Sequence, residues 1–332
     1  MDNVARATAI GMMAPMLWGM SVGITRGIAE NYGIAGGFAA LYTLAFFGLL
    51  FTVGRPQLRR FNWKYLVFGV GLANISAMCF VFSLALSQGG HQTMEVGMVN
   101  YLWPCITIVL GIIFNGQRAR WWIVIGIALC LMGVVTVLAG DRGFDVNVLY
   151  AHILENPMSY GLALLGAITW SGYSSITRAL SNGQNPVVLI FFGDMIIFYA
   201  VWFLGLGTPP VEHPHGYGWI GIVMGAFATG AGYSCWTYGM MKGNMTLLAI
   251  TSYFTPVLSC LFGTVWIGAE LTFGFWKGVM ILVAGSLICY LSTRVGIVPA
   301  RPGKVLFKGI NPSAKVRVKP RPVSIEDRET DA

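Results

Sequence analysis

Charged residues are scarce in this chain, which indicates that most of it does not face water. Only 10% of the 332 residues are charged, whereas 56% are hydrophobic and the mean hydropathy is +0.68. A soluble domain carries about 25% charged residues, so most of this chain is excluded from water. The sequence therefore predicts an all-α integral membrane protein.

Motifs for enzymatic and metal chemistry are also missing. The chain contains no G-x-S-x-G and no H-E-x-x-H, and Asp194 is the one carboxylate expected well inside an apolar span. His213 and His215, beside Glu212, lack the i, i+4 spacing of a helical zinc site. All six cysteines fall in apolar spans, where cysteine usually acts as a small hydrophobe. We therefore expect no enzymatic activity, no metal and no cofactor.

Apolar stretches long enough to cross a bilayer recur along the chain. A hydrocarbon core of about 30 Å requires about 20 predominantly apolar residues in a helix. Five such stretches are expected in each half of the sequence. They cover residues 7–29, 34–53, 64–86, 94–114 and 121–138, then residues 158–180, 186–206, 217–240, 245–266 and 273–293. The sequence thus predicts ten transmembrane helices.

The two halves share residues at a constant offset of 152 positions. Trp18 and Ile24-Thr25-Arg26 reappear as Trp170 and Ile176-Thr177-Arg178. The other shared positions are Tyr101, Pro104, Gly69, Gly111, Gly126 and Gly133, which match Tyr253, Pro256, Gly221, Gly263, Gly278 and Gly285. Because five spans is an odd number, the second copy must enter the membrane from the opposite side, as in inverted-repeat transporters. We expect two inverted five-helix repeats, residues 7–140 and 157–294, around a central cavity.

Positive charge gathers on one side of this predicted topology. Cytoplasmic loops accumulate lysine and arginine. With both termini inside, only Arg26, Arg142 and Lys277 of the 21 basic residues fall on the opposite side. Both termini are therefore expected in the cytoplasm, with residues 295–332 forming a disordered basic tail near the anionic leaflet. The net charge of +8 is spread over loops and this tail, so we expect the lipid bilayer and no nucleic acid as a partner.

Aromatic and polar side chains inside the spans are the candidate substrate site. Tryptophan and tyrosine normally collect at the membrane interfaces, so an aromatic residue deep in a span suggests a cavity. The alternative is that these rings only pack between helices. The candidate substrate-binding residues are Trp18, Tyr42, Asn100, Tyr101, Trp103, Trp170, Tyr173, Trp236, Ser252 and Tyr253.

Five other residues are candidates for gating or coupling: His91, Glu95, Pro104, Asp194 and Pro256. The prolines remove backbone donors and can kink their helices. Asp194 either faces a wet cavity and couples protons, or is a hydrogen-bonded acid that locks two helices, which we favour. Glu95 and His91 either gate the outer mouth or form a pair exposed at the interface, the commoner arrangement. Arg26 is expected to snorkel to the headgroup region.

These features together resemble a known family of transporters. Ten spans in two inverted copies, with a tryptophan in spans one and six and Tyr-x-x-Pro in spans four and nine, are similar to EamA-type exporters of the drug/metabolite transporter superfamily. Within it, Trp18-Gly19, Asn100-Tyr101-Leu102-Trp103-Pro104 and Gln88-Gly89-Gly90-His91 resemble bacterial inner-membrane exporters of aromatic amino acids. The resemblance implies export of phenylalanine, tyrosine and tryptophan, with threonine and methionine as further substrates. It also implies that spans five and ten stand apart as supports.

We therefore expect export by alternating access, with the substrate's ring stacked on aromatic side chains of the cavity. The alternative is an exporter of cationic drugs or other small metabolites on the same fold. A sensor that binds ligand without flux is a further class, although nothing beyond the tail supplies a signalling output. The sequence leaves open the substrate ranking, the coupling ion, the oligomeric state and the resting conformation.

Overall fold

The computed structural model of the protein describes residues 3–115, 119–142, 150, 153–181, 184–207, 218–243 and 245–294. These residues form helices joined by short connections, and the described part of the chain contains no strand. The helices of the first half are α1 Asn3–Gly19, α2 Ser21–Tyr32, α3 Ile34–Thr52, α4 Gly71–Ala85, α5 Gly89–Asn100, α6 Trp103–Asn115 and α7 Ile123–Ala139. Those of the second half are α9 Pro157–Leu180, α10 Val187–Phe203, α11 Gly218–Lys242, α12 Met245–Ser252, α13 Thr255–Trp266 and α14 Phe273–Arg294.

Four helical segments among the described residues are long and apolar enough to cross a membrane. They are Ile34–Thr52, Tyr65–Ala85, Gly89–Phe114 and Phe273–Thr293. A fifth is added if α1 and α2, which are bent by 41° at their junction, count as one span. Three shorter apolar helices are Ile123–Ala139, Val187–Phe203 and Thr255–Trp266. The described part of the chain is thus all-helical with apolar helices. The number of spans found by this length and hydropathy criterion is smaller than the ten predicted. The predicted tail, residues 295–332, lies outside the described residues.

Three of the predicted spans are broken helices. The span at 7–29 divides at Met20, next to Gly19 and Ser21, a glycine-serine context in which sharp kinks are common. In the other two, α5 ends at Asn100 before α6 begins, and α12 ends at Ser252 before α13 begins. Pro104 and Pro256 occupy the first turn of the second segment, where the missing N–H breaks no helical hydrogen bond. The helix is thus interrupted just before each proline, while the kink expected from each proline stays a prediction.

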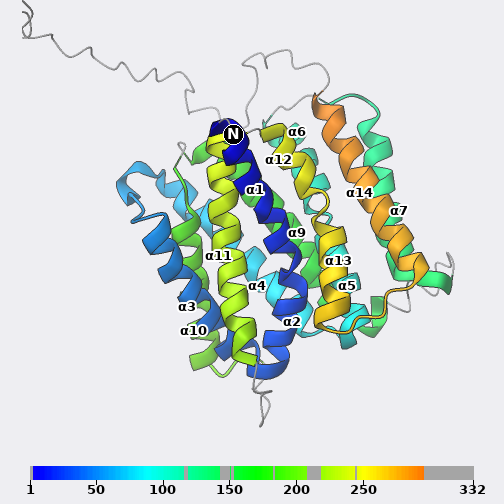
Figure 1. Ribbon diagram of the computed structural model, residues 1–332, viewed down its shortest axis with the longest axis horizontal. Coiled ribbons are helices and arrows are strands. Elements are labelled where there is room, and N and C mark those ends of the chain that lie inside the picture. The colour runs from blue at the N-terminus through cyan, green and yellow to red at the C-terminus, as the bar shows by residue number, and fades with distance from the viewer. Residues whose placement is uncertain are drawn as a thin grey trace, which may run out of the picture.

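Helices α7 and α14 form a tight pair at one edge of the molecule (Figure 1). Their contact is built on the glycines that the repeat relates. A Cβ atom at Gly133 would lie 2.5 Å from the Leu282 backbone nitrogen, and one at Gly285 would lie 2.6 Å from the Cys130 nitrogen. A Cβ atom at Gly278 would lie 2.6 Å from the Val137 nitrogen. The absence of side chains at these positions is therefore what lets the two backbones touch.

The remaining helices pack across the two halves of the chain. Helix α1 packs against α11 and α4 packs against α9, while α3 packs against α10. In the sequence, the offset of 152 residues makes α1 correspond to α9 and α4 correspond to α11. The α1–α11 contact is therefore equivalent to the α9–α4 contact under the repeat. The halves are therefore interleaved, and helices of both halves pack together in the centre (Figure 1).

Candidate functional site

Tyr233 on α11 is the centre of a cluster of aromatic rings. Its ring centroid lies 5.3 Å from that of Trp18 on α1 and 5.9 Å from that of Trp170 on α9. Phe191 on α10 lies 5.5 Å away on a third side. All three contacts are edge-to-face, which is a favourable geometry for aromatic pairs. Tyr233 therefore contacts both tryptophans that the repeat relates.

Further ring contacts extend this cluster. Trp236 contacts Trp18 at 5.3 Å, and Tyr42 contacts Phe191 at 5.8 Å. Trp170 contacts Tyr173 at 5.0 Å and Trp103 at 6.4 Å. We call this set the central aromatic network: Trp18, Tyr42, Trp103, Trp170, Tyr173, Phe191, Tyr233 and Trp236. It contains six of the ten candidate substrate-binding residues and draws on α1, α3, α6, α9, α10 and α11.

The network keeps partly accessible rings and one unsatisfied polar atom. Trp18, Trp103, Trp170, Tyr233 and Trp236 are only half-buried, whereas its other members are buried. The buried Nε1 of Trp18 has no hydrogen-bond acceptor among the described residues. It lies against Gly232, where a Cβ atom would be only 2.7 Å from it. An unpaired buried donor costs about 1–3 kcal/mol, so an acceptor that reached this N–H would be stabilised there.

Tyr101, Ser252 and Tyr253 lie in a different environment. Tyr101 and Tyr253 are buried in a core cluster with side chains of α7 and α14, where Tyr253 contacts Tyr290 at 5.7 Å. No ring contact joins either tyrosine to the central aromatic network within the part of the chain that the structure describes, and Ser252 is buried beside Tyr253. The two tyrosines thus pack in the core, and substrate binding by these three residues stays a prediction.

Asn100 lies at the helix break and stands between the two environments. Its Nδ2 donates to the Ala163 carbonyl at 3.1 Å, which fixes the end of α5 on α9. Its Oδ1 has no donor among the described residues.

Asp194 is buried at the edge of the central aromatic network. Only 2% of the residue is exposed, and its Oδ1 accepts a hydrogen bond from Asn74 Nδ2 at 2.7 Å. Asn74 also donates to the Ile190 carbonyl at 2.8 Å, so it joins α4 to α10. Tyr42 and Tyr233 lie within electrostatic reach of the carboxyl group. This is the geometry expected of an acid that locks two helices, with Asn74 as the partner that sequence reasoning missed.

Glu95 and His91 lie one helical turn apart on α5. The His91 Nδ1 is 3.2 Å from Glu95 Oε1, and the Tyr160 hydroxyl donates to Oε2 at 2.7 Å. The prediction of a pair exposed at the interface was wrong for Glu95, whose side chain is 1% exposed because α9 covers it. His91 keeps 41% of its side chain exposed and forms the outward half of the pair.

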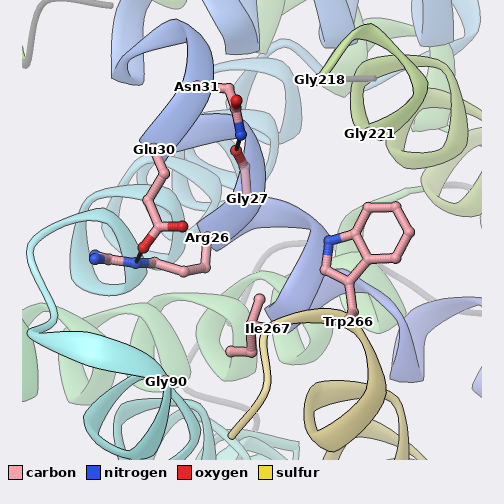
Figure 2. Close-up of a pocket in the computed structure, with 9 residues that line it drawn as sticks. All are labelled: Arg26, Gly27, Glu30, Asn31, Gly90, Gly218, Gly221, Trp266 and Ile267. Carbon is pink, nitrogen blue, oxygen red and sulfur yellow. Dashed lines mark hydrogen bonds and ion pairs between the residues drawn. The ribbon is translucent and has the colours of Figure 1, made fainter. Parts of the chain in front are cut away.

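Arg26 also departs from its expected position. Instead of snorkelling into the headgroups, its side chain is 13% exposed and donates to the carbonyls that end α4 and to Glu30. An open cavity of about 410 Å³ lies beside it, at the end of the molecule where α2 ends and α11 begins (Figure 2). Arg26, Glu30, Asn31, Trp266, Ile267 and four glycines line this outer cavity.

Three cysteines form a buried group between α6, α7 and α14. The Sγ atoms of Cys105, Cys130 and Cys289 lie within 4.8 Å of one another, and those of Cys105 and Cys289 are 3.9 Å apart. Three thiols can hold a soft metal ion, but these are surrounded by apolar side chains of the core. Of the other metal candidates, His213, His215 and Glu212 lie outside the described residues.

Sequence reasoning missed Tyr233 and Phe191. Neither ring is duplicated by the repeat, and the equivalent of Tyr233 in the first half is Val81. The usable signal was local, because Tyr233 precedes Trp236 by three residues and therefore shares its helix face.

The fold and this membrane-embedded aromatic site describe a transporter, and comparison with known proteins identifies its class. The EamA-like transporter family model matches residues 6–139 and again residues 157–291. The chain belongs to this family, which confirms the resemblance drawn from its motifs. A solved crystal structure shares the fold with a TM-score of 0.60 and 23% identity, and the match covers 87% of this chain and 98% of that one.

Two curated relatives are closer in sequence. The chain is 40% identical over 292 residues to a protein of Escherichia coli (strain K12) named aromatic amino acid exporter YddG, covering 88% of this chain and 99% of the relative. It is 38% identical over 290 residues to the protein of the same name from Salmonella typhimurium (strain 14028s / SGSC 2262), covering 87% and 98%. The similarity to aromatic amino acid exporters that was drawn from short motifs thus extends over most of the chain.

Proposed function

We propose that this protein exports aromatic amino acids from the cytoplasm across a bacterial inner membrane. The observation that carries the proposal is the position of Tyr233 between Trp18 and Trp170, in a network of half-buried rings. Aromatic pairs contribute about 0.5–1.5 kcal/mol beyond the burial of area, and a substrate ammonium adds a cation–π attraction to the same rings. The names of the relatives from Escherichia coli and Salmonella support this substrate class. The protein acts as a carrier and not as an enzyme.

The architecture that we propose is ten transmembrane helices in two inverted repeats, residues 7–140 and 157–294. Three observations support it: helix bounds recur at an offset of 152, the family model matches twice, and the α1–α11 contact is equivalent to the α9–α4 contact. The distribution of basic residues supports cytoplasmic termini, with residues 295–332 as a basic cytoplasmic tail.

Transport proceeds by alternating access in this proposal. The substrate enters from the cytoplasm and stacks its ring on Trp18, Trp103 or Trp170. The Oδ1 of Asn100, which has no donor among the described residues, accepts from the substrate's ammonium group. The halves then rock against each other, and the helix breaks before Pro104 and Pro256 absorb the change.

Counterflow in proteoliposomes tests the proposal. Vesicles preloaded with unlabelled phenylalanine should accumulate labelled tryptophan or phenylalanine. Trp103→Ala should lower tryptophan uptake more than threonine uptake, because only the former loses a ring contact. The matched control is Trp121→Ala, which removes a tryptophan that is 78% exposed and outside the network. Absence of accumulation by folded protein, or equal loss of both substrates in Trp103→Ala, would refute the proposed substrate class or the ring site.

Export of cationic compounds is the second candidate, and Asp194 is the observation that favours it. A buried carboxyl group beside Tyr42 and Tyr233 is a potential partner for a cation that reaches the network. Asp194→Asn should then abolish transport of a cationic drug and spare phenylalanine. Retention of both activities would leave Asp194 with the locking role alone.

A further inference from the structure

The outer cavity contains an arginine that is held in place by the protein itself. Arg26 Nε donates to Glu30 Oε1 at 2.6 Å, and Nη1 donates to the carbonyls of Ala85 at 2.9 Å and Ser87 at 2.5 Å. These contacts fix the guanidinium without using Nη2, which has no partner among the described residues. A guanidinium held in this way is pre-organised to bind a carboxylate.

Glu30 places a negative charge directly beside that donor. Its side chain is 52% exposed, and Oε1 is the oxygen that pairs with Arg26. Its Oε2 has no partner in the part of the chain that the structure describes, and is available to an ammonium group. Opposite charges side by side match the two charges of an amino acid zwitterion, which are separated by one carbon atom.

Trp266 provides an aromatic wall on the other side of the cavity (Figure 2). Its ring stacks on Phe262 with a centroid distance of 5.5 Å and an interplanar angle of 19°. Gly27 makes room for this ring, because a Cβ atom there would lie only 3.1 Å from Trp266 Nε1, whereas a Cβ atom at Gly221 would lie at an ordinary 4.0 Å from Cζ2. The cavity volume of about 410 Å³ falls within the range of about 300–1,000 Å³ found for small-molecule pockets.

We propose that the outer cavity is a second amino acid site, separate from the central aromatic network, which receives the aromatic substrate before release. Arg26 binds the carboxylate, Glu30 binds the ammonium group and Trp266 stacks on the ring. The inference rests on the proposed export of aromatic amino acids, because the ligand of the second site is the substrate of that export.

Protection of an introduced cysteine tests the site by position. Gly221→Cys places a thiol in the lining, and a Cβ atom there meets only ordinary contacts, 3.5 Å from Ile28 and 4.0 Å from Trp266. The variant, in nanodiscs, is labelled with a charged maleimide, and the labelling of the parent protein is subtracted. We expect phenylalanine to slow labelling, whereas phenethylamine and phenylpropionate, which each lack one charge, should protect at least about tenfold less well.

Glu30→Gln should raise the phenylalanine concentration for half-protection about tenfold. Its matched control is Glu270→Gln, which removes a charge from an exposed position in the loop after α13, outside the lining, and should leave protection unchanged. Trp266→Leu should weaken protection by phenylalanine and leave that by alanine unaltered. Each variant is also assayed for phenylalanine counterflow.

The outcomes separate this inference from the proposed function. Protection that depends on Glu30 and Trp266 supports the second site. A cysteine that is not labelled, protection equal for all three compounds, or protection insensitive to Glu30→Gln would overturn it, while counterflow in the same preparation would leave the export function standing. Loss of both counterflow and protection in the parent would instead overturn the export function and the second site together.

Discussion

The close contact of α7 and α14 predicts that Gly133→Ala destabilises the protein. The new Cβ atom would lie 2.5 Å from the Leu282 backbone nitrogen and 2.8 Å from its Cα atom. Because both are backbone atoms, no side chain can rotate away, and the helices must separate until the contact reaches ordinary van der Waals distance, by about 0.9 Å. Overpacking of this kind costs about 1–3 kcal/mol, and we expect the upper end.

Alanine also favours the helix by about 1 kcal/mol over glycine, so the net destabilisation should be about 2 kcal/mol. The matched control is Gly161→Ala on α9, at an exposed helical position where a Cβ atom would meet nothing within 4 Å. This control should gain the helix propensity of alanine without overpacking. The free energies of unfolding of the two variants should therefore differ by about 3 kcal/mol.

Thermal unfolding in detergent, followed by circular dichroism, measures this difference. Gly133→Ala should melt several degrees below the parent protein, and Gly161→Ala should melt no lower than the parent. The ratio of tryptophan to threonine counterflow should be unchanged in Gly133→Ala, because the α7–α14 pair does not contribute rings to the central aromatic network. Equal melting temperatures for the two variants would show that the α7–α14 backbones do not touch.

Three further predictions concern the centre of the molecule. Tyr233→Leu removes three ring contacts and should lower tryptophan counterflow relative to threonine counterflow about tenfold. Tyr233→Phe keeps the ring and should retain the parent ratio. Equal ratios for the two variants would exclude a role for the ring. Gly232→Ala should displace the Trp18 indole and raise the half-saturating tryptophan concentration severalfold in counterflow, and an unchanged value would contradict the contact. Asn74→Leu leaves Asp194 without its donor and should cost about 1–3 kcal/mol in thermal unfolding, and an unchanged melting temperature would contradict the locking role of this pair.

Local sequence features anticipated the helices and their breaks. The apolar stretches, the repeat and the two Tyr-x-x-Pro segments are each read from neighbouring residues, and they correspond to helices and to the breaks after Asn100 and Ser252. The bend at Met20 was not anticipated, although Gly19 and Ser21 flank it, because the span at residues 7–29 was predicted from hydropathy, which carries no information on a kink.

The candidate site was predicted less completely, because burial and facing direction are set by other helices. Trp18 and Trp170 were recognised from the repeat, and they lie in one network. Tyr101 and Tyr253 were selected by the same criterion and instead lie in the core beside α14. Selection by symmetry identified duplicated rings but could not tell a ring that faces the network from one that packs behind it.

The sequence by itself determined the solvent of this protein, the duplication of its helices and the family to which it belongs, because composition, periodicity and motifs are properties of the chain. Only the tertiary structure decided that Tyr233 meets Trp18 and Trp170, that Asn74 meets Asp194, and that Arg26 turns inward beside Glu30. The contacts of Tyr233 and of Asn74 join residues on helices that are far apart in the sequence, and the packing of these helices brings the residues together. The inward turn of Arg26 depends equally on α4, whose terminal carbonyls hold its guanidinium in place.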